Sequence, residues 1–269
     1  MATFLFDSIV FGPVSSRRLG VSLGINLLPV SRKVCSYNCI YCECGWTPGK
    51  PGTDEKLPSR KAVFEALKNK LSEMREQGEA PDVITYAGNG EPTLHPEFAG
   101  IIDDSIALRN MFFPEARISV LSNGSMLRRK TVRDALKKAD MNILKLDSAI
   151  PGTAEQLNQP HVKADIGNLE KYAADFEGKF IIQTLFVRGE CNGRKVDNTT
   201  PEEISAWLDA LARLRPQQVM IYTIHRDTPL GNNLSKVPVG ELNELACRVN
   251  ELGITTTVSG QRPGTWQRF

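Results

Sequence analysis

Short β-branched runs alternate with amphipathic helical patterns along most of this chain, and this alternation limits its fold more than any other feature. Six runs are typical of buried strands, over residues 21–28, 83–86, 118–121, 143–146, 180–187 and 219–223. Helical patterns separate or follow them over residues 60–77, 96–110, 128–139, 165–176, 202–214 and 240–252. Because parallel strands need crossover connections, the alternation predicts an α/β fold with a parallel sheet. The pattern alone leaves open a doubly wound sheet and a full or partial barrel.

Local signals mark the ends of the later helices. Thr200 precedes Pro201, and Glu203 stands three positions after Thr200, which predicts a capping box with proline at the first helical position. Gly253 predicts the end of the last helix, and residues 254–258 could then form a seventh strand.

Composition places the chain among ordinary globular proteins. Its 269 residues are 41% hydrophobic and 24% charged, with a formal net charge of +2, which argues against general disorder, a collagen and a highly charged tail. We expect a single domain over residues 1–269, with its core at about 18–259, because no linker interrupts the alternation. No apolar run approaches the ~18 residues that span a bilayer, and no signal peptide is evident. We therefore expect a cytoplasmic protein without a membrane partner.

The cysteines are unevenly distributed. Four of the six lie within ten residues, at Cys35, Cys39, Cys42 and Cys44. The first three form a C-x3-C-x2-C pattern in the loop after the first predicted strand, and three thiolates so close can occupy three corners of one iron–sulfur cube. A zinc site usually pairs C-x2-C with a second ligand pair, which the three histidines do not supply. We interpret Cys44 as a non-ligand, and Cys191 and Cys247 as ordinary thiols.

With Tyr41 just before the last cysteine, the C-x3-C-x2-C pattern is identified as the signature of the radical SAM superfamily. The flanking segments FGPVSSRRLGVSLGINLLP and CECG resemble a group of wyosine-type tRNA-modification iron–sulfur oxidoreductases, and the resemblance covers roughly residues 11–259. It implies a partial (β/α)6 barrel of the TIM type. It also implies a [4Fe–4S] cluster on Cys35, Cys39 and Cys42, with S-adenosylmethionine (SAM) on the open iron and Tyr41 among the cofactor-binding residues.

The resemblance implies an enzyme in which the reduced cluster cleaves SAM to a 5′-deoxyadenosyl radical that abstracts hydrogen from a substrate. An electron donor such as flavodoxin or ferredoxin is then a partner. The substrate is expected to be a tRNA or nucleoside, or else a protein or peptide. The charge of +2 weighs modestly against a large nucleic acid. A non-enzymatic iron–sulfur binding or electron-transfer protein is the alternative.

Ligands of parallel α/β folds gather at the carboxyl ends of the strands, so the motifs that follow the strands are candidates for binding. The second strand runs into AGNGEP, in which four residues align with the superfamily's GGE element for the methionine amino group: Gly88, Asn89, Gly90 and Glu91. Asn89 departs from the usual glycine, and the segment on its own predicts a turn. The third strand ends in SNGS, where Ser122 and Asn123 occupy the ribose and carboxylate position by resemblance. For Ser122, a helix cap or tight turn is equally open.

Lys145 and Asp147 lie on the same side of the fourth strand by its period of two. Asp147 is a candidate for binding ribose hydroxyls and Lys145 for binding substrate, and a Lys145–Asp147 ion pair lining the barrel is the alternative. On the fifth strand, Gln183 is expected to point inward to cofactor or substrate. Val187 falls where the superfamily packs adenine.

Three histidine and arginine positions stay ambiguous. His225 and Arg226 follow the sixth strand and are candidates for recognising polar groups of the substrate, with an ordinary surface loop as the alternative. His95 either caps the following helix or faces the site, and we favour the structural role.

Overall fold

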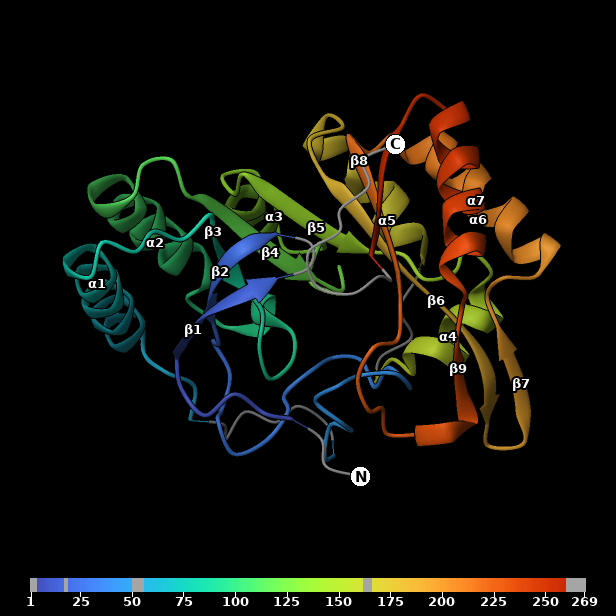
Figure 1. Ribbon diagram of the computed structural model, residues 1–269, viewed down its shortest axis with the longest axis horizontal. Helices are drawn as coiled ribbons and strands as arrows, with labels where there is room; N and C mark the ends of the chain where they lie inside the picture. Colours follow the sequence, from blue (N-terminus) through green and yellow to red (C-terminus); the bar gives the residue numbers. More distant parts are fainter. Residues whose placement is uncertain (1–3, 17–18, 50–55, 162–165, 260–269) are drawn as a thin grey trace.

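The fold is built on one curved sheet, seen in the computed structural model, which describes residues 4–16, 19–49, 56–161 and 166–259. The strands follow the order β1-β2-β3-β4-β5-β6-β8-β10 (Figure 1). Their bounds are β1 Val10–Ser16, β2 Gly20–Ile25, β3 Val83–Tyr86, β4 Arg117–Ser122, β5 Met141–Lys145, β6 Ile181–Cys191, β8 Gln218–Thr223 and β10 Thr255–Ser259. All neighbours pair in parallel except β1 with β2.

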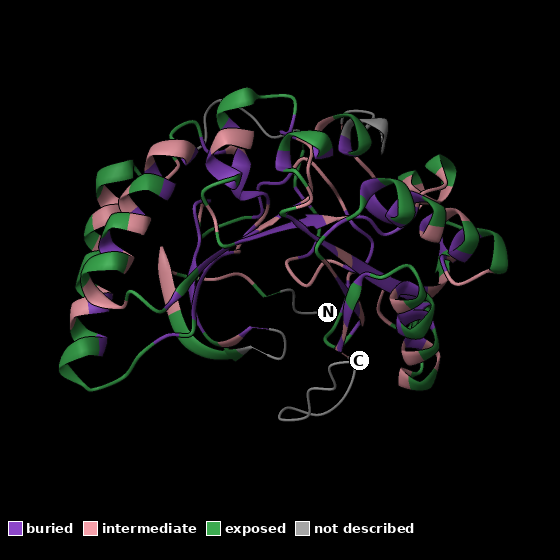
Figure 2. Cartoon of the chain, turned by 90° about the horizontal axis from the view of Figure 1, so that it is seen from above, coloured by how far each residue is buried: buried purple, intermediate pink, exposed green. Residues whose placement is uncertain are grey.

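The helices cover the outer, convex side of this sheet. Viewed from above, they form an outer arc around the buried strands, and the arc does not close (Figure 2). Their bounds are α1 Arg60–Glu76, α2 Phe98–Phe112, α3 Lys130–Leu136, α4 Pro151–Asn158, α5 Ile166–Ala173, α6 Pro201–Leu214 and α7 Val239–Glu251. The strand path ends at β1 on one side and at β10 on the other. The structure is therefore the partial α/β barrel that the sequence led us to expect.

The alternation of side chains along each strand divides the core into two parts. On β3, Ile84 and Tyr86 face the helices and belong to the large core, whereas Val83 belongs to a small cluster inside the barrel. Met141 and Met220 join that inner cluster from β5 and β8. The lower part of the barrel is thus filled by apolar side chains, which leaves the carboxyl ends of the strands for the site.

The predicted seventh strand is confirmed as β10, and the structure adds elements that the sequence reading missed. Strand β6 continues past its parallel part and forms antiparallel pairs with β7 (Arg194–Asp197) and β9 (Leu234–Lys236). Asn192 and Gly193 join β6 to β7 with positive φ angles of 52° and 73°, as a tight two-residue hairpin turn requires. Helix α4 was also missed, because its eight residues carry no side-chain N-cap and only a weak helical pattern.

The capping box at α6 is half formed. The Thr200 side chain accepts a hydrogen bond from the Glu203 amide at 3.3 Å, as predicted. The Glu203 carboxylate instead accepts a bond from Ser148 Oγ at 2.6 Å, which ties the start of α6 to the loop after β5. No helix in the described part of the chain combines the length and the apolar character needed to cross a membrane.

Trp207 of α6 offers a test of the packing between helix and sheet. Its ring is 1% exposed, packs edge-to-face on Phe186 at 5.1 Å, and donates Nε1–H to Thr184 Oγ1 at 3.0 Å. Trp207→Ala should lower the free energy of unfolding by about 3–5 kcal/mol, because it leaves a cavity in the core. Urea denaturation measures this, with Trp46→Ala as the control, because Trp46 is 41% exposed. A loss below about 1 kcal/mol would contradict the packing.

Candidate functional site

The C-x3-C-x2-C cysteines lie in one tight loop at the carboxyl end of β2. Cys35 and Cys39 are buried, and Cys42 is half-buried. The Cys42 amide donates to the Cys39 carbonyl at 3.0 Å, and the Gly45 amide donates to the Cys42 carbonyl at 2.9 Å. These successive turns fold the segment back on itself. They bring three thiols from eight residues of sequence into one region at the mouth of the barrel.

The cysteine loop is docked onto the loop after β3 by backbone pairing. The Val34 amide donates to the Asn89 carbonyl at 2.8 Å, and the Glu91 amide donates to the Val34 carbonyl at 3.1 Å. Gly90 lies between them with φ of 141°, and a Cβ there would come 1.7 Å from the Val34 carbonyl oxygen. Glycine is therefore required at position 90, because no side chain fits between the two loops.

Helix α4 supports the cysteine loop from the other side. The Asn38 amide donates to the Asn158 carbonyl and the Ile40 amide to the Leu157 carbonyl, each at 2.9 Å. The Cys39 thiol also lies 3.4 Å from Asn158 Oδ1. Backbone amides between the cysteines are thus satisfied by an element more than a hundred residues away.

Burial and local hydrogen bonds give the thiols different acidities. Burial raises the pKa of Cys35 to about 12 and that of Cys39 to about 11. The pKa of Cys42 is lowered to about 6, mainly by a hydrogen bond from Cys44 and further by the positive charge of Lys33. Cys44 Sγ also lies 3.4 Å from the Gly88 carbonyl oxygen, so Cys44 contacts the loop after β3.

Lys33 is a buried cation in this loop that the sequence reading missed. Its Nζ donates to the Gly45 carbonyl at 2.9 Å. Burial by itself lowers the pKa of Lys33, but the thiols of Cys42, Cys35 and Cys39 outweigh it and raise the pKa above the ordinary value. The ammonium therefore stays charged beside the three cysteines.

The donor set suits an iron–sulfur cluster. Soft thiolate ligands favour such clusters. Within the described ranges, no three His, Cys, Asp or Glu side chains gather closely enough to hold a single metal ion. Ligands of one zinc ion lie ~2.3 Å from a shared centre, whereas ligands on separate corners of a cube lie further apart.

The Glu91 carboxylate joins the segments that follow β3 and β4. It accepts hydrogen bonds from Thr93 N at 3.1 Å, Thr93 Oγ1 at 2.5 Å, Ser122 Oγ at 2.9 Å and Asn123 N at 2.7 Å. Burial raises the pKa of Glu91, and these four donors oppose that effect. Ser122 therefore acts here as a partner of Glu91, and its oxygen also accepts from the Gly124 amide at 3.1 Å as in a tight turn.

Asn89, which replaces the usual glycine, has a structural role. Its side-chain amide donates to the Phe6 and Pro29 carbonyls at 2.8 and 2.9 Å, and its oxygen accepts from the Phe6 amide at 2.8 Å. The side chain thus ties the N-terminal segment to the loop after β2. Gly88 and Gly90 on either side keep their backbones in positive-φ conformations of 146° and 141°.

Asn123 reaches from the end of β4 to the cysteine loop. Its Nδ2 donates to Ser36 Oγ at 2.9 Å and lies 3.7 Å from Cys35 Sγ. Ser36 Oγ is also 2.7 Å from Ser125 Oγ. The structure therefore brings together the cysteine loop and the SNGS segment, which the sequence analysis had placed at one end of the barrel.

Tyr41, Lys145 and Asp147 form a buried network. The Tyr41 hydroxyl donates to Asp147 Oδ2, and Lys145 Nζ lies 2.6 Å from the same oxygen and 4.5 Å from the centre of the Tyr41 ring. Asp147 Oδ1 accepts from the Leu185 amide at 3.0 Å. The Lys145–Asp147 ion pair, left open by the sequence, is present. Burial lowers the pKa of Lys145, and the negative charges around it, that of Asp147 foremost, together outweigh this and raise the pKa.

The remaining predicted residues lie on β6 and after β8. Gln183 is half-buried and pairs in register with Lys145 and Met220, so it faces the barrel interior. Val187 is fully buried, and its amide donates to Asn198 Oδ1 at 2.9 Å. Asn198 was not predicted, because it lies eleven residues away across the β6–β7 hairpin.

His225 and Arg226 are exposed in the loop after β8. Arg226 Nη1 forms an ion pair at 2.9 Å with Glu43 Oε2, which lies beside Cys42 and Cys44. This pair connects the two ends of the open sheet across the barrel mouth. His95 is buried away from the cysteines, where its Nδ1 accepts from the Glu97 amide at 3.1 Å, so the favoured structural role is confirmed.

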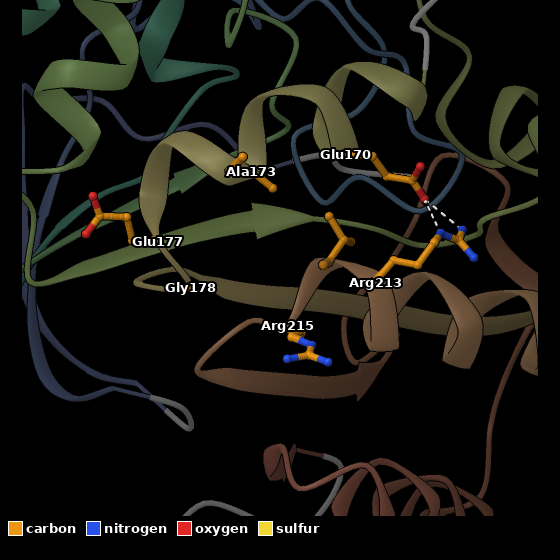
Figure 3. Close-up of a pocket in the computed structure, with 8 residues that line it drawn as sticks. Glu170, Ala173, Glu177, Gly178, Arg213 and Arg215 are labelled. Atoms are coloured by element: carbon orange, nitrogen blue, oxygen red, sulfur yellow. Dashed lines mark hydrogen bonds and ion pairs between the residues drawn. The ribbon is translucent and has the colours of Figure 1, made fainter.

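A hollow of about 450 Å³ lies at the opposite end of the barrel (Figure 3). It is formed between α5 and α6, next to Gly178 and Arg215, which precede β6 and β8. Arg213 and Glu170 close one side with an exposed ion pair at 2.7 Å. Because the hollow borders the segments that lead into the strands, it is separate from the site at their carboxyl ends.

Comparison with known proteins agrees with this geometry. The model of the Radical SAM superfamily matches residues 31–150, which contain the cysteine loop and the ends of β3 to β5. A UPF0026 protein of Helicobacter pylori strain J99 is 31% identical over 223 residues, covering 81% of this chain and 67% of its own length. Among the curated relatives, the matched share of their length ranges from 30% to 78%.

Solved structures share the fold at low sequence identity. A radical SAM methyltransferase from Sphaerobacter thermophilus has a TM-score of 0.64 and 14% identity, over 90% of this chain and 67% of that protein. Archaeal TYW1 has a TM-score of 0.52 and 13% identity, over 89% and 75%. The chain is thus a member of the radical SAM superfamily, whose enzymes use a [4Fe–4S] cluster and SAM, and it belongs there with the UPF0026 proteins.

Proposed function

We propose that Cys35, Cys39 and Cys42 hold the [4Fe–4S] cluster and that the loops after β3 and β4 hold SAM against it. One observation carries this proposal: a single loop presents the three thiols and is docked by backbone bonds onto the Gly88–Glu91 segment. The Asn123 amide, 3.7 Å from Cys35 Sγ, adds the β4 end to the same place. When bound, the reduced cluster and SAM supply a 5′-deoxyadenosyl radical that removes a hydrogen atom from the substrate.

The residues of this chain position the groups and exclude water. The missing side chains at Gly88 and Gly90 let the loop after β3 pack against Asn26 and Val34, and this docked loop presents its backbone to the methionine moiety. The Glu91 carboxylate holds that loop against Asn123, and the Tyr41–Asp147–Lys145 network fixes the aromatic residue of the cysteine loop over β5. We assign Gln183 and the Val187 backbone to the adenosine side, because both lie on β6 at the barrel interior. An external donor such as flavodoxin or ferredoxin supplies the electron.

Single cysteine variants test the ligand assignment. Cys39→Ala should reduce bound iron from about four atoms per chain to near none and abolish dithionite-dependent release of 5′-deoxyadenosine, because three thiolates are needed to hold the cube. Cys247→Ala, at an exposed position on α7, should leave both unchanged. Iron analysis and chromatography after anaerobic reconstitution measure the two quantities.

Cys44→Ala tests whether Cys44 is a ligand as well as the three assigned cysteines. This variant should keep the bound iron. If Cys39→Ala still released 5′-deoxyadenosine, or if Cys44→Ala lost the cluster while Cys42→Ala kept it, the ligand set would be wrong. If the wild type bound iron and SAM without releasing 5′-deoxyadenosine, the electron-transfer alternative would replace an enzyme.

For the substrate, we propose a tRNA or nucleoside. The support is the resemblance of the sequence around the cysteines to wyosine-type enzymes, together with exposed basic residues on loops at the mouth of the barrel. Arg128 and Arg129 follow β4, Arg194 and Lys195 lie at the β6–β7 hairpin, and Arg226 follows β8. Phosphate groups attract such side chains irrespective of base sequence. A protein or peptide is the competing substrate class.

A tRNA-binding measurement distinguishes these classes. Unfractionated tRNA should bind with an affinity that falls as salt increases, and Arg128→Ala/Arg129→Ala should weaken binding at least tenfold and reduce the salt slope by about 1.4 if each arginine contacts one phosphate. The matched control is Lys68→Ala/Lys137→Ala, which removes two exposed charges from α1 and the end of α3. Equal binding by both double variants, or no salt-dependent binding by the wild type, would favour a protein or peptide substrate.

A further inference from the structure

Lys33 is an unusual cation because it is buried inside the loop that carries the cysteines. It stands two residues before Cys35, and its side chain is 3% exposed. The Nζ atom donates to the Gly45 carbonyl at 2.9 Å. The Lys33 side chain therefore bridges the cysteine loop, from a residue before Cys35 to a residue after Cys44. The backbone of the next residue, Val34, is fixed by its pairing with Gly90. The position of the charge is therefore set by the fold.

The neighbours of this ammonium are thiols. Cys42, Cys35 and Cys39 are the groups whose charge raises the pKa of Lys33. Within the described ranges, the structure gives Lys33 no carboxylate ion pair. Lys145, a half-buried lysine near the site, is instead neutralised by Asp147 at 2.6 Å. Because a buried charge is costly without a partner, the compensating negative charge for Lys33 has to come from the thiolates and what they bind.

We propose that Lys33 adjusts the cluster's reduction potential, its fixed positive charge favouring the reduced form. The inference rests on the proposed function, because it requires the cluster on Cys35, Cys39 and Cys42. A 2+ core with three thiolates has a net charge of about −1, and one electron from an external reductant makes it about −2. Attraction to a nearby cation therefore grows on reduction. The fixed charge of Lys33 therefore makes the electron easier for the cluster to accept.

A purely structural role is the competing explanation, since the Lys33 bond to the Gly45 carbonyl also closes the loop. The two roles differ in what they require of the side chain. Tuning requires a positive charge, which Lys33→Arg retains and which Lys33→Met and Lys33→Gln remove. Loop closure requires a donor to the Gly45 carbonyl, which Lys33→Gln can still supply. Lys138→Met is the matched charge control, because Lys138 forms an exposed ion pair with Asp103 at 2.6 Å.

The experiment is an anaerobic redox titration of the reconstituted full chain, followed by electron paramagnetic resonance, with iron content and thermal unfolding measured on the same samples. We expect Lys33→Met and Lys33→Gln to hold the cluster with an equilibrium constant for reduction at least tenfold lower, a shift of about 59 mV for one electron. Lys33→Arg and Lys138→Met should stay within threefold of the wild type. The shift should persist in high salt, because buried charges are screened little.

Each outcome is decisive. An unshifted reduction potential in cluster-loaded Lys33→Met and Lys33→Gln overturns the proposal. The proposal is also overturned if Lys33→Gln has the same reduction potential as Lys33→Arg. If Lys33→Met and Lys33→Gln both lose the cluster, a Lys33→Arg variant that keeps it supports a role for the charge. If Lys33→Arg also loses the cluster, a role for the charge is overturned. A wild type that binds no iron contradicts the proposed function instead, and iron analysis reveals that case before any titration.

Discussion

A close approach of two backbones, Val34 against Gly90, is the contact on which the rest of the site depends. Two backbone hydrogen bonds at Val34 join the loops after β2 and β3, and the absence of a side chain at Gly90 makes the approach possible. The cysteine loop begins at the next residue, so its direction follows from this contact. Position 90 is therefore constrained by packing between loops, independently of any ligand.

Buried polar groups then hold the strand ends in one arrangement. Glu91 takes four hydrogen bonds from three residues, and Asp147 takes three interactions from Tyr41, Lys145 and the Leu185 amide. A buried carboxylate that is fully hydrogen-bonded restricts the loops around it, because leaving any donor or acceptor unpaired is costly. The mouth of the barrel is thus organised by the protein's own contacts. Such preorganisation is what a site needs in order to orient a cofactor.

The sequence predicted those features of the fold and the site that a local residue pattern controls. Strand and helix alternation placed six parallel strands, cysteine spacing located the loop, and the period of two paired Lys145 with Asp147. Contacts between segments that are distant in the sequence could not be predicted in this way. Asn89 looked like a departure from a ligand motif, yet its side chain binds Phe6 and Pro29, and the amides of the cysteine loop are satisfied by α4. These roles depend on which loops the fold brings together, and no periodicity in one segment records that.

The open side of the barrel follows from the same topology. Strands β2 and β8 lie near opposite ends of the sheet, and the Arg226–Glu43 ion pair connects the loops that follow them. Both side chains are substantially exposed, and exposed pairs contribute only about 0–1 kcal/mol. A continuous hydrogen-bonded strand would hold these edges far more firmly than one such pair. The two loops also share a hydrophobic cluster that includes Ile40, Tyr41 and Ile224, and this packing adds to the ion pair in holding them together beside the cysteines.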